Sequence, residues 1–324
     1  MASASRLTTA IDDGLLTLPD GSIAVMRPSA QFDISRLPRE QVVISHTFRP
    51  DFVAWEHAGY PVAQAAASCD LAIVVVPRSK TLAQAMIAAA AQKAPRVAVD
   101  GYKTDGIDSL FKACRKRLGD LPSVAKDHGR LFWMEPEDHF LDWLAPKPAR
   151  GPEGFFTSSG VFSEGSVDKG SALLAASLPA KLPARMADFG AGWGYLTDAI
   201  LKRDGVKTVD LIEAEALSLE CAKLNITDSR AVFHWADATT FIADKGFDGV
   251  VMNPPFHTGR AADPALGRAF IQAARRLLAP HGKLWMVANR HLPYESSLKE
   301  SFRNVDELAG NGAFKVFHAT RPFR

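Results

Sequence analysis

The chain is poor in cysteine, in long apolar runs and in net charge. Its three cysteines, Cys69, Cys114 and Cys221, lie far apart with no CxxC pair, which argues against a zinc ribbon or a disulfide framework and fits a reducing cytoplasm. No apolar run approaches the length of a membrane span, and the N-terminus lacks the apolar core of a signal peptide. The net charge is only +2 with no basic tail, so any contact with nucleic acid must come from a local patch. We therefore expect a cytoplasmic protein that binds neither metal nor membrane.

One proline-rich segment divides the chain into two halves. Residues 144–154 hold three prolines and two glycines, and such a segment supports neither a helix nor a central strand. At 324 residues the chain is long for one core and sufficient for two. We expect one domain over residues 1–147 and another over residues 155–324. The sequence does not fix the oligomeric state, and a monomer is compatible with it.

Short apolar segments alternate with helical segments through the second half. We expect strands over residues 185–188, 208–212, 232–235, 247–252 and 283–288. We expect helices over residues 171–178, 194–202, 216–224 and 264–278. This alternation predicts an α/β domain with a parallel, Rossmann-like sheet covered on both faces.

The first half repeats part of this pattern. A strand-like segment over residues 70–77, an alanine-rich helix over 81–93 and a returning strand over 96–99 follow the order seen in residues 247–288. The repetition predicts two tandem domains of the same kind. The first copy has no Gly-x-Gly-x-Gly after any strand, and residues 77–79 read Pro-Arg-Ser. We therefore expect the N-terminal domain to be degenerate and to have lost catalysis.

A glycine turn follows the expected strand over residues 185–188. It consists of Asp188, Gly190, Gly192 and Gly194 at alternating positions, and glycines let the backbone bend sharply and approach a ligand closely. A dinucleotide fold requires a different spacing, with its last glycine at Tyr195. Asp188 can pair with the amino group of a methionine moiety. A glycine triplet alone is also compatible with a tight turn without a ligand, but with the motifs downstream it predicts S-adenosylmethionine as the cofactor.

Acidic residues follow the next two strands. Glu213 ends the strand over residues 208–212, where an acid can accept hydrogen bonds from two vicinal ribose hydroxyls. Asp210 and Glu215 compete with it, and helix capping is the alternative role. Asp237, with Ala238, is placed to accept from the adenine amino group, and a turn aspartate is its alternative. We assign Glu213, Asp237 and Ala238 to the cofactor site.

The segment after the strand over residues 247–252 suits chemistry on a planar amine. The Asn253 side chain and the Pro254 carbonyl can accept hydrogen bonds from one NH2 group, while the prolines hold these acceptors still. Phe256 offers a stacking face for a base, although it is also compatible with a core residue. We assign Asn253, Pro254, Pro255 and Phe256 as the catalytic residues. His257 is a weaker candidate, as a general base or a substrate contact. An exposed or structural histidine is favoured, because methyl transfer here requires no dedicated base.

These motifs together resemble one known family. They are residues 157–163 with Asp168-x-Gly170, the glycine turn, Asn253-Pro-Pro-Phe-His, and residues 283–294. The combination resembles the ribosomal RNA small subunit methyltransferase C family of guanine-N2 methyltransferases over roughly residues 155–320. The resemblance implies a class I methyltransferase fold, S-adenosylmethionine as cofactor with Phe162 among its contacts, and transfer to guanosine N2. It implies ribosomal RNA or the small ribosomal subunit as partner.

The first half resembles the degenerate methyltransferase domain of that family, notably at residues 77–80 and 101–106. In such relatives residues 101–106 would contain more glycine and an arginine, so this departure leaves the RNA role of the segment open. We expect the domain to be a scaffold or RNA platform. Arg290 and Tyr294 are candidates to hold a phosphate or a base, against the alternative of a surface loop with an ordinary ion pair. The basic run over residues 112–117 fits a solvated helix face.

Other functions remain compatible with these residues. The motifs do not separate small-subunit from large-subunit RNA, and an amine of protein glutamine or of DNA adenine also suits Asn-Pro-Pro-aromatic. A non-enzymatic alternative is an RNA-binding assembly protein with a vestigial cofactor site, against which the intact glycine turn, Glu213 and Asn253 argue. A nicotinamide oxidoreductase is disfavoured by the glycine spacing.

Overall fold

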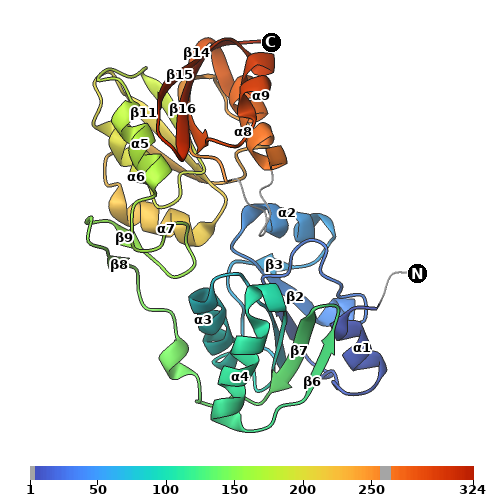
Figure 1. The fold of residues 1–324 in the computed structure, drawn as a ribbon. Helices are drawn as coiled ribbons and strands as arrows, with labels where there is room; N and C mark the ends of the chain where they lie inside the picture. Colours follow the sequence, from blue (N-terminus) through green and yellow to red (C-terminus); the bar gives the residue numbers. More distant parts are fainter. Residues whose placement is uncertain (1–3, 256–263) are drawn as a thin grey trace. The chain divides into compact units, whose positions relative to one another are not determined.

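The computed structural model describes residues 4–255 and 264–324, which form two compact units (Figure 1). The first unit spans Met1–Lys147 and the second spans Pro148–Arg324. The boundary between them lies inside the proline-rich segment over residues 144–154. Phe256 and His257 lie outside the described residues, so the roles assigned to them stay predictions.

The first unit is built on one mixed sheet. Its strands are β1 (Ile23–Met26), β2 (Val42–Ser45), β3 (Val62–Ala63), β4 (Leu71–Val75), β5 (Val97–Tyr102), β6 (Ser123–Lys126) and β7 (Gly129–Met134). Its helices are α1 (Arg6–Asp12), α2 (Arg49–His57), α3 (Lys80–Ala91) and α4 (Ile107–Leu118), with short 3-10 turns η1 (Arg39–Gln41), η2 (Lys103–Asp105) and η3 (Leu141–Trp143). The strand order is β3-β2-β1-β4-β5-β7-β6.

Alternate residues of the central strands face two separate layers of the first unit. On β4, Ala72 and Val74 belong to the cluster that packs under α3 and α4. Leu71 and Ile73 belong to the cluster under α1 and α2. A strand buried on both faces needs apolar side chains at every position, because successive side chains point to opposite sides. This explains why residues 71–75 form an unbroken apolar run.

The second unit contains a small hairpin and a second mixed sheet. Its strands are β8 (Ala149–Arg150), β9 (Phe156–Thr157), β10 (Arg185–Phe189), β11 (Thr208–Glu213), β12 (Ala231–Trp235), β13 (Phe247–Met252), β14 (Leu278–Asn289), β15 (Phe302–Gly310) and β16 (Phe314–Pro322). Its helices are α5 (Lys169–Ser177), α6 (Tyr195–Leu201), α7 (Ala216–Asn225), α8 (Pro264–Leu277) and α9 (Tyr294–Ser301). The main sheet has the order β12-β11-β10-β13-β14-β16-β15.

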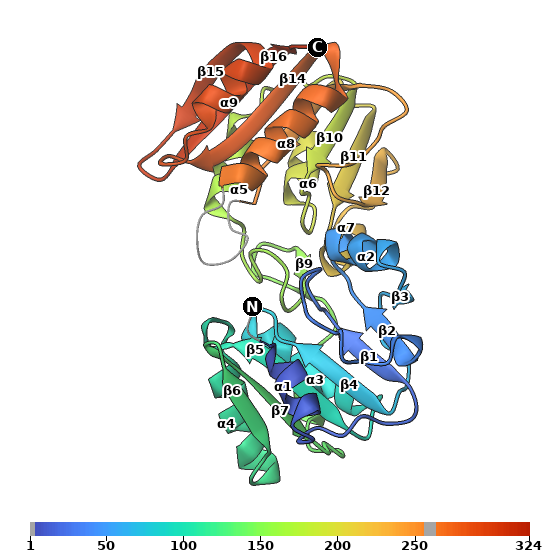
Figure 2. The ribbon, with the colours of Figure 1, turned by 90° about the vertical axis from the view of Figure 1, so that its right-hand side faces the viewer.

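Helices cover both faces of this sheet, as the alternation of strands and helices predicted (Figure 2). One layer joins Phe189, Val250 and Met252 to α8 and α9. The opposite layer joins Leu211 and Val251 to helices that include α5 and α6. Together the two layers hold β10, β11 and β13 in the centre of the sheet, with their carboxyl ends at one edge.

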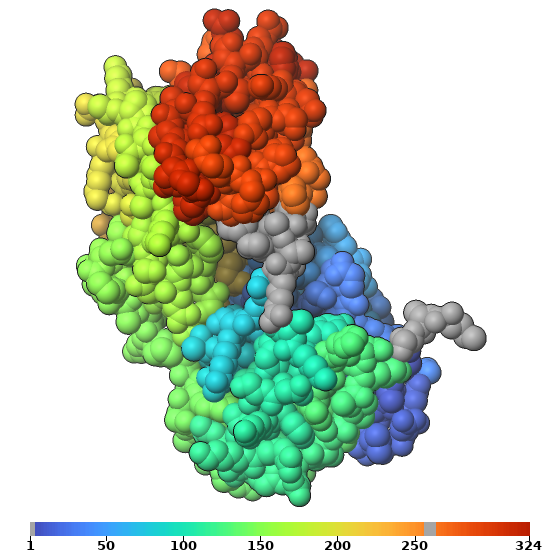
Figure 3. Space-filling model, in the orientation of Figure 1, coloured from blue at the N-terminus to red at the C-terminus, as the bar shows by residue number. Residues whose placement is uncertain are grey.

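The predicted parallel sheet is confirmed for β10 to β14, but the sheet as a whole is mixed. Strand β14 pairs with β16, and β16 pairs with β15, in antiparallel fashion. The reason is a tight turn at Asn311-Gly312, where the Asn311 side-chain oxygen accepts hydrogen bonds from the backbone N–H groups of Ala313 and Phe314 at 2.8 and 2.9 Å. Asn-Gly between two strand-like runs is a strong hairpin signal. This C-terminal hairpin, drawn in red, forms part of the surface of the second unit (Figure 3).

The two sheets share one topology. If the seven strands of each sheet are numbered in the order in which they follow along the chain, both sheets begin with the parallel order third-second-first-fourth-fifth and end with an antiparallel hairpin. The repeated strand and helix pattern in the sequence is therefore matched by a repeated architecture. Within residues 4–255 and 264–324, no helix is both long enough and apolar enough to cross a membrane.

Candidate active site

The glycine turn leaves β10 in a left-handed backbone conformation. The φ angles of Gly190, Gly192 and Gly194 are +68°, +56° and +92°, which side chains with a Cβ rarely adopt. A Cβ on Gly194 would lie 3.0 Å from the side chain of Ile226, whereas a Cβ on Gly192 would meet no atom within 4 Å. Gly194 therefore serves packing, while Gly192 borders open space that a ligand can occupy.

Glu213 anchors this turn at the end of β11. Its Oε2 accepts a hydrogen bond from the Gly192 N–H at 2.8 Å, and its Oε1 accepts one from the Glu215 N–H at 2.7 Å. Burial raises the pKa of Glu213 to about 7, although these backbone hydrogen bonds favour the ionised form. Each oxygen keeps further acceptor capacity. The sequence predicted that Glu213 binds the ribose, but it did not predict that Glu213 also shapes the glycine turn.

Asp188 lies directly beneath the turn and is fully buried. Its Oδ2 accepts a hydrogen bond from the Thr197 hydroxyl at 2.7 Å, while its Oδ1 is buried without a hydrogen-bond partner among the described residues. Burial, and to a lesser degree the nearby charge of Glu213, raises the pKa of Asp188 to about 7. An orphaned acceptor of this kind is expensive, and it is the feature most in keeping with a site that receives a hydrogen-bond donor.

Asn253 follows β13 and is held by two residues near the start of α5. Its Nδ2 donates hydrogen bonds to Asp168 Oδ2 at 2.9 Å and to Ser171 Oγ at 2.8 Å. Both N–H groups of the amide are therefore used, and Oδ1 remains as an acceptor. Pro254 is buried and Pro255 is exposed. The acceptor role of Asn253 stays a prediction. The sequence motifs included Asp168 but gave no sign that it and Ser171 hold this amide.

The glycine turn and Asn253 border one pocket. Its lining combines residues from the segment before α5, the glycine turn and the start of α6, namely Phe162, Ser163, Asp168, Ser171, Gly190, Ala191, Gly192, Trp193, Tyr195, Leu196 and Asn253. Phe162 is 57% exposed, and its carbonyl accepts a hydrogen bond from the Trp193 indole at 3.0 Å. The two sequence motifs thus meet at one place on the sheet edge.

Asp237 and Ala238 are not among the residues that line this pocket. Asp237 Oδ1 accepts hydrogen bonds from the backbone N–H and the hydroxyl of Thr239 at 2.8 and 2.7 Å, and Ala238 is buried. These contacts are those of a turn aspartate, the alternative that the sequence left open. Their assignment to the cofactor stays a prediction.

The competing acids near Glu213 are used elsewhere. Asp210 contacts His234 at 2.8 Å across the sheet. Glu215 accepts a hydrogen bond from the Leu217 N–H at the start of α7. Of these three acids, Glu213 is therefore the one that contacts the glycine turn.

Arg290 and Tyr294 are the two residues that were considered as RNA contacts, with an ordinary ion pair as the alternative. Tyr294 is only 1% exposed, and it packs so closely against α8 that a Cβ on Gly267 would lie 2.0 Å from its hydroxyl. This burial leaves no ring face for a base. Arg290 pairs with Glu307 at 3.0 Å and donates to the Asn311 carbonyl at 2.6 Å, so it fastens the hairpin of β15 and β16 to the end of β14.

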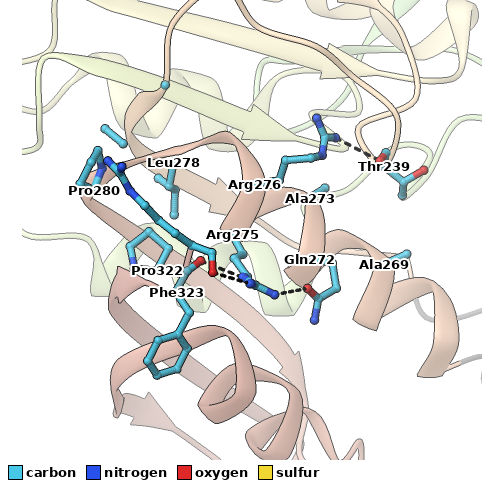
Figure 4. A pocket seen from close by; sticks show the side chains of 13 residues that line it. Thr239, Ala269, Gln272, Ala273, Arg275, Arg276, Leu278, Pro280, Pro322 and Phe323 are labelled. Atoms are coloured by element: carbon cyan, nitrogen blue, oxygen red, sulfur yellow. Dashed lines mark hydrogen bonds between the residues drawn. The ribbon is translucent and has the colours of Figure 1, made fainter.

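A second pocket of the unit lies at the other end of the strands (Figure 4). Its lining includes Gln272, Arg275, Arg276 and Phe323. The two guanidinium groups donate to backbone carbonyls, from Arg275 to Phe323 at 2.8 Å and from Arg276 to Phe241 at 2.7 Å. These arginines tie the C-terminus and the loop after β12 to α8.

Comparisons with known proteins identify the family of the chain. The methyltransferase small domain family matches residues 153–318. A ribosomal RNA small subunit methyltransferase C from Shewanella pealeana is 32% identical over 266 residues, covering 76% of each chain. The protein of the same name from Hahella chejuensis is 28% identical and covers 93% of this chain and 94% of its own. The chain belongs to this methyltransferase family.

A solved structure extends the relationship to both units of this methyltransferase. The T. thermophilus 16S rRNA N2 methyltransferase, in complex with AdoMet and guanosine, matches with a TM-score of 0.80 and 27% identity. The match covers 95% of this chain and 90% of that one. The resemblance seen in the sequence motifs is thereby confirmed, and the fold is the α/β class I methyltransferase fold with two mixed sheets.

The buried Asp188 makes the stability of the free enzyme depend on pH. Because its pKa is raised to about 7, the folded state keeps a proton that the unfolded state loses near its ordinary value of 3.8. This contribution to stability is complete below that value and is lost as pH rises through about 7, an effect on the order of a few kcal/mol. The free energy of unfolding, measured with urea between about pH 5 and pH 8, should fall less steeply with pH in Asp188→Asn than in the wild type. Parallel pH profiles for the two proteins would contradict the burial argument.

Proposed function

We propose that this protein transfers a methyl group from S-adenosylmethionine to the exocyclic N2 of a guanosine in small-subunit ribosomal RNA. The observation that carries the proposal is the single pocket shared by the glycine turn and Asn253. One part of that pocket suits a cofactor close to the backbone, and the other offers an acceptor for an NH2 group. Its relatives include ribosomal RNA small subunit methyltransferases C, and the similar solved structure is a complex with AdoMet and guanosine.

The residues present fit the cofactor. Gly192 borders space that any side chain would fill, and Glu213 presents a carboxylate with spare acceptor capacity beside it. We infer that Glu213 would accept from the ribose hydroxyls and that the acceptor beneath the turn, Asp188, would favour the positively charged methionine end. Phe162 would cover the pocket from its exposed position. The bound cofactor supplies an electrophilic methyl group, and the protein supplies its placement.

The acceptor nitrogen needs help because its lone pair is delocalised into the guanine ring. Asn253 Oδ1 would accept a hydrogen bond from one hydrogen of the amine, and the Pro254 carbonyl would accept one from the other. Two acceptors on one NH2 group favour a pyramidal nitrogen, whose lone pair can attack. The prolines fix the direction of these acceptors, so most of the rate enhancement comes from positioning. The new substituted amine returns to neutrality by losing a proton to water or to a nearby acceptor.

The base must leave its stack to reach this pocket. Enzymes that modify bases compensate the unstacking cost by stacking the base on an aromatic or apolar side chain. Phe256, the next residue after Pro255, is the natural candidate for that contact. It lies outside the described residues, so its role is carried by its place in the sequence.

We further propose that the first unit is a degenerate copy without a cofactor site. Met26, the last residue of β1, pairs with Ser45 of β2 and with Val74 of β4. Phe189, the last residue of β10, is paired in the same way with β11 and β13. The backbone continues alike, because the N–H groups of Arg27 and Gly190 each donate to the carbonyl at the end of the neighbouring strand.

This register shows which residues of the first unit occupy the positions of the candidate active site. They are Val25 for Asp188, Arg27 for Gly190, His46 for Glu213 and Val75 for Asn253. None of the four keeps its chemistry. The two acids are replaced by a valine and a histidine, the glycine by an arginine, and the amide by a valine. Burial and the nearby Arg27 lower the pKa of His46 to about 3, so it stays neutral there. These replacements support a scaffold or RNA platform in place of a second catalytic domain.

Replacing Asn253 with alanine should abolish methyl transfer while cofactor binding is kept. The change removes an acceptor that the amine needs in the transition state, so we expect turnover at least about 100-fold lower. Purified enzyme, labelled cofactor and small subunits from cells lacking the protein would be combined, and N2-methylguanosine in the digested RNA measured by mass spectrometry. Asn304→Ala, a change of the same kind on β15, is the matched control. Near-normal turnover by Asn253→Ala, or methylation of another nucleoside by the wild type, would contradict the proposal.

Replacing Gly192 with leucine should abolish cofactor binding, because the new side chain would enter the pocket. The left-handed φ adds a cost of about 1–2 kcal/mol to folding. Gly14→Leu is the control, since Gly14 also has a positive φ and open space around it but lies in the first unit. Calorimetry should find one cofactor per chain for the wild type and for Gly14→Leu, and none for Gly192→Leu. Two sites per chain in the wild type would show that the first unit binds the cofactor as well.

A further inference from the structure

The amide of Asn253 is held from behind by a carboxylate and a hydroxyl. Asp168 Oδ2 and Ser171 Oγ accept its two N–H groups at 2.9 and 2.8 Å. If the amide were turned over, its oxygen would face the Asp168 carboxylate, and two acceptors would repel each other. The orientation with Oδ1 free is therefore imposed by the surroundings and does not wait for the substrate.

We propose that Asp168 is a positioning residue, with Ser171 as its assistant, that keeps Asn253 in the orientation needed to accept from the target amine. This rests on the proposed function of the same pocket. A freely rotating amide would present an NH2 group to the amine of the substrate in part of its conformations, and that arrangement cannot accept a hydrogen bond. Fixing the amide beforehand removes the non-productive conformations and lowers the entropy cost of reaching the transition state.

The same oxygen of Asp168 also caps a helix. Asp168 Oδ2 accepts a hydrogen bond from the Ser171 N–H at 2.8 Å at the start of α5. Space for this arrangement depends on Gly170, where a Cβ would lie 3.0 Å from Asp168 Oδ2 and 3.1 Å from the ring of Phe314. The amide of Asn253 is thus tied to a rigid helix, in keeping with the need for a precise site to stand on regular structure.

The charge of Asp168 adds to the effect of its geometry. A carboxylate that accepts an amide N–H polarises the amide and makes Oδ1 a stronger acceptor. The target amine becomes a better donor as its nitrogen gains positive charge during methyl transfer. The interaction therefore strengthens on the way to the transition state, so its loss lowers kcat. Binding of the cofactor should be affected little.

Two substitutions of Asp168 separate these effects. Asp168→Asn keeps one oxygen that can accept both hydrogen bonds and loses the charge. Asp168→Ser is an equally good helix cap, but its side chain is too short to reach Asn253. We expect kcat to fall about tenfold in Asp168→Asn and about 100-fold in Asp168→Ser, with the dissociation constant of S-adenosylmethionine within about threefold of the wild type.

Two serines of α5 provide a matched pair. Ser171→Ala removes the second acceptor for the Asn253 amide and should lower kcat about fivefold. Ser177→Ala is the same chemical change in the same helix, and its hydroxyl only donates to the Leu173 carbonyl at 2.8 Å. We expect Ser177→Ala to keep kcat within about twofold. Equal losses in the two variants would assign the effect to the helix and overturn the proposal.

A direct observation of the amide distinguishes this proposal from the proposed function. In 15N NMR spectra, the side-chain NH2 signals of Asn253, assigned by their loss in Asn253→Ala, should be shifted and protected in the wild type and collapse toward free-amide values in Asp168→Ser. That result supports the positioning role even if the wild type produces no N2-methylguanosine, in which case only the proposed function fails. Unchanged NH2 signals in Asp168→Ser, wild-type kcat in that variant, or a parallel loss of cofactor affinity would overturn the proposal.

Discussion

The parallel pairing of β10 with β13 is the interaction on which the candidate active site depends. Phe189 lies opposite Met252, so the next residues along the two strands, Gly190 and Asn253, start from the same edge of the sheet. A slip of one residue would turn the buried side chains of either strand to the wrong face. The apolar core that fixes this register therefore also fixes the distance between the glycine turn and the Asn253 amide.

The first unit repeats this register without the chemistry. Its strands meet in the same order. Arg27 has the same left-handed backbone conformation as Gly190, with a φ of +59°, although it carries a side chain. Such a conformation costs free energy for any residue with a Cβ. The backbone path is thus repeated where the side chains differ, in keeping with the general rule that one fold can carry different sites.

Much of the site could be predicted because its parts carry local signals. The spaced glycines after one strand mark Gly192, and the two prolines after another strand mark Asn253, without knowledge of the rest of the chain. The contact between Asp168 and Asn253 joins residues 85 positions apart, and the burial of Tyr294 depends on the space that Gly267 leaves, so neither is written in a local pattern. The C-terminal hairpin was missed although Asn311-Gly312 marks it, because the last strand that the alternation predicted ended at residue 288.

The two hydrogen bonds that Glu213 accepts from the backbone have a consequence for how variants combine. The carboxylate that we propose to meet the ribose also holds Gly192, 21 residues away in the sequence, in its bent conformation. Exchanging the glutamate therefore alters the shape of the cradle as well as one contact inside it. Changes at the two positions should not sum in their effect on affinity, because both alter the same hydrogen bond.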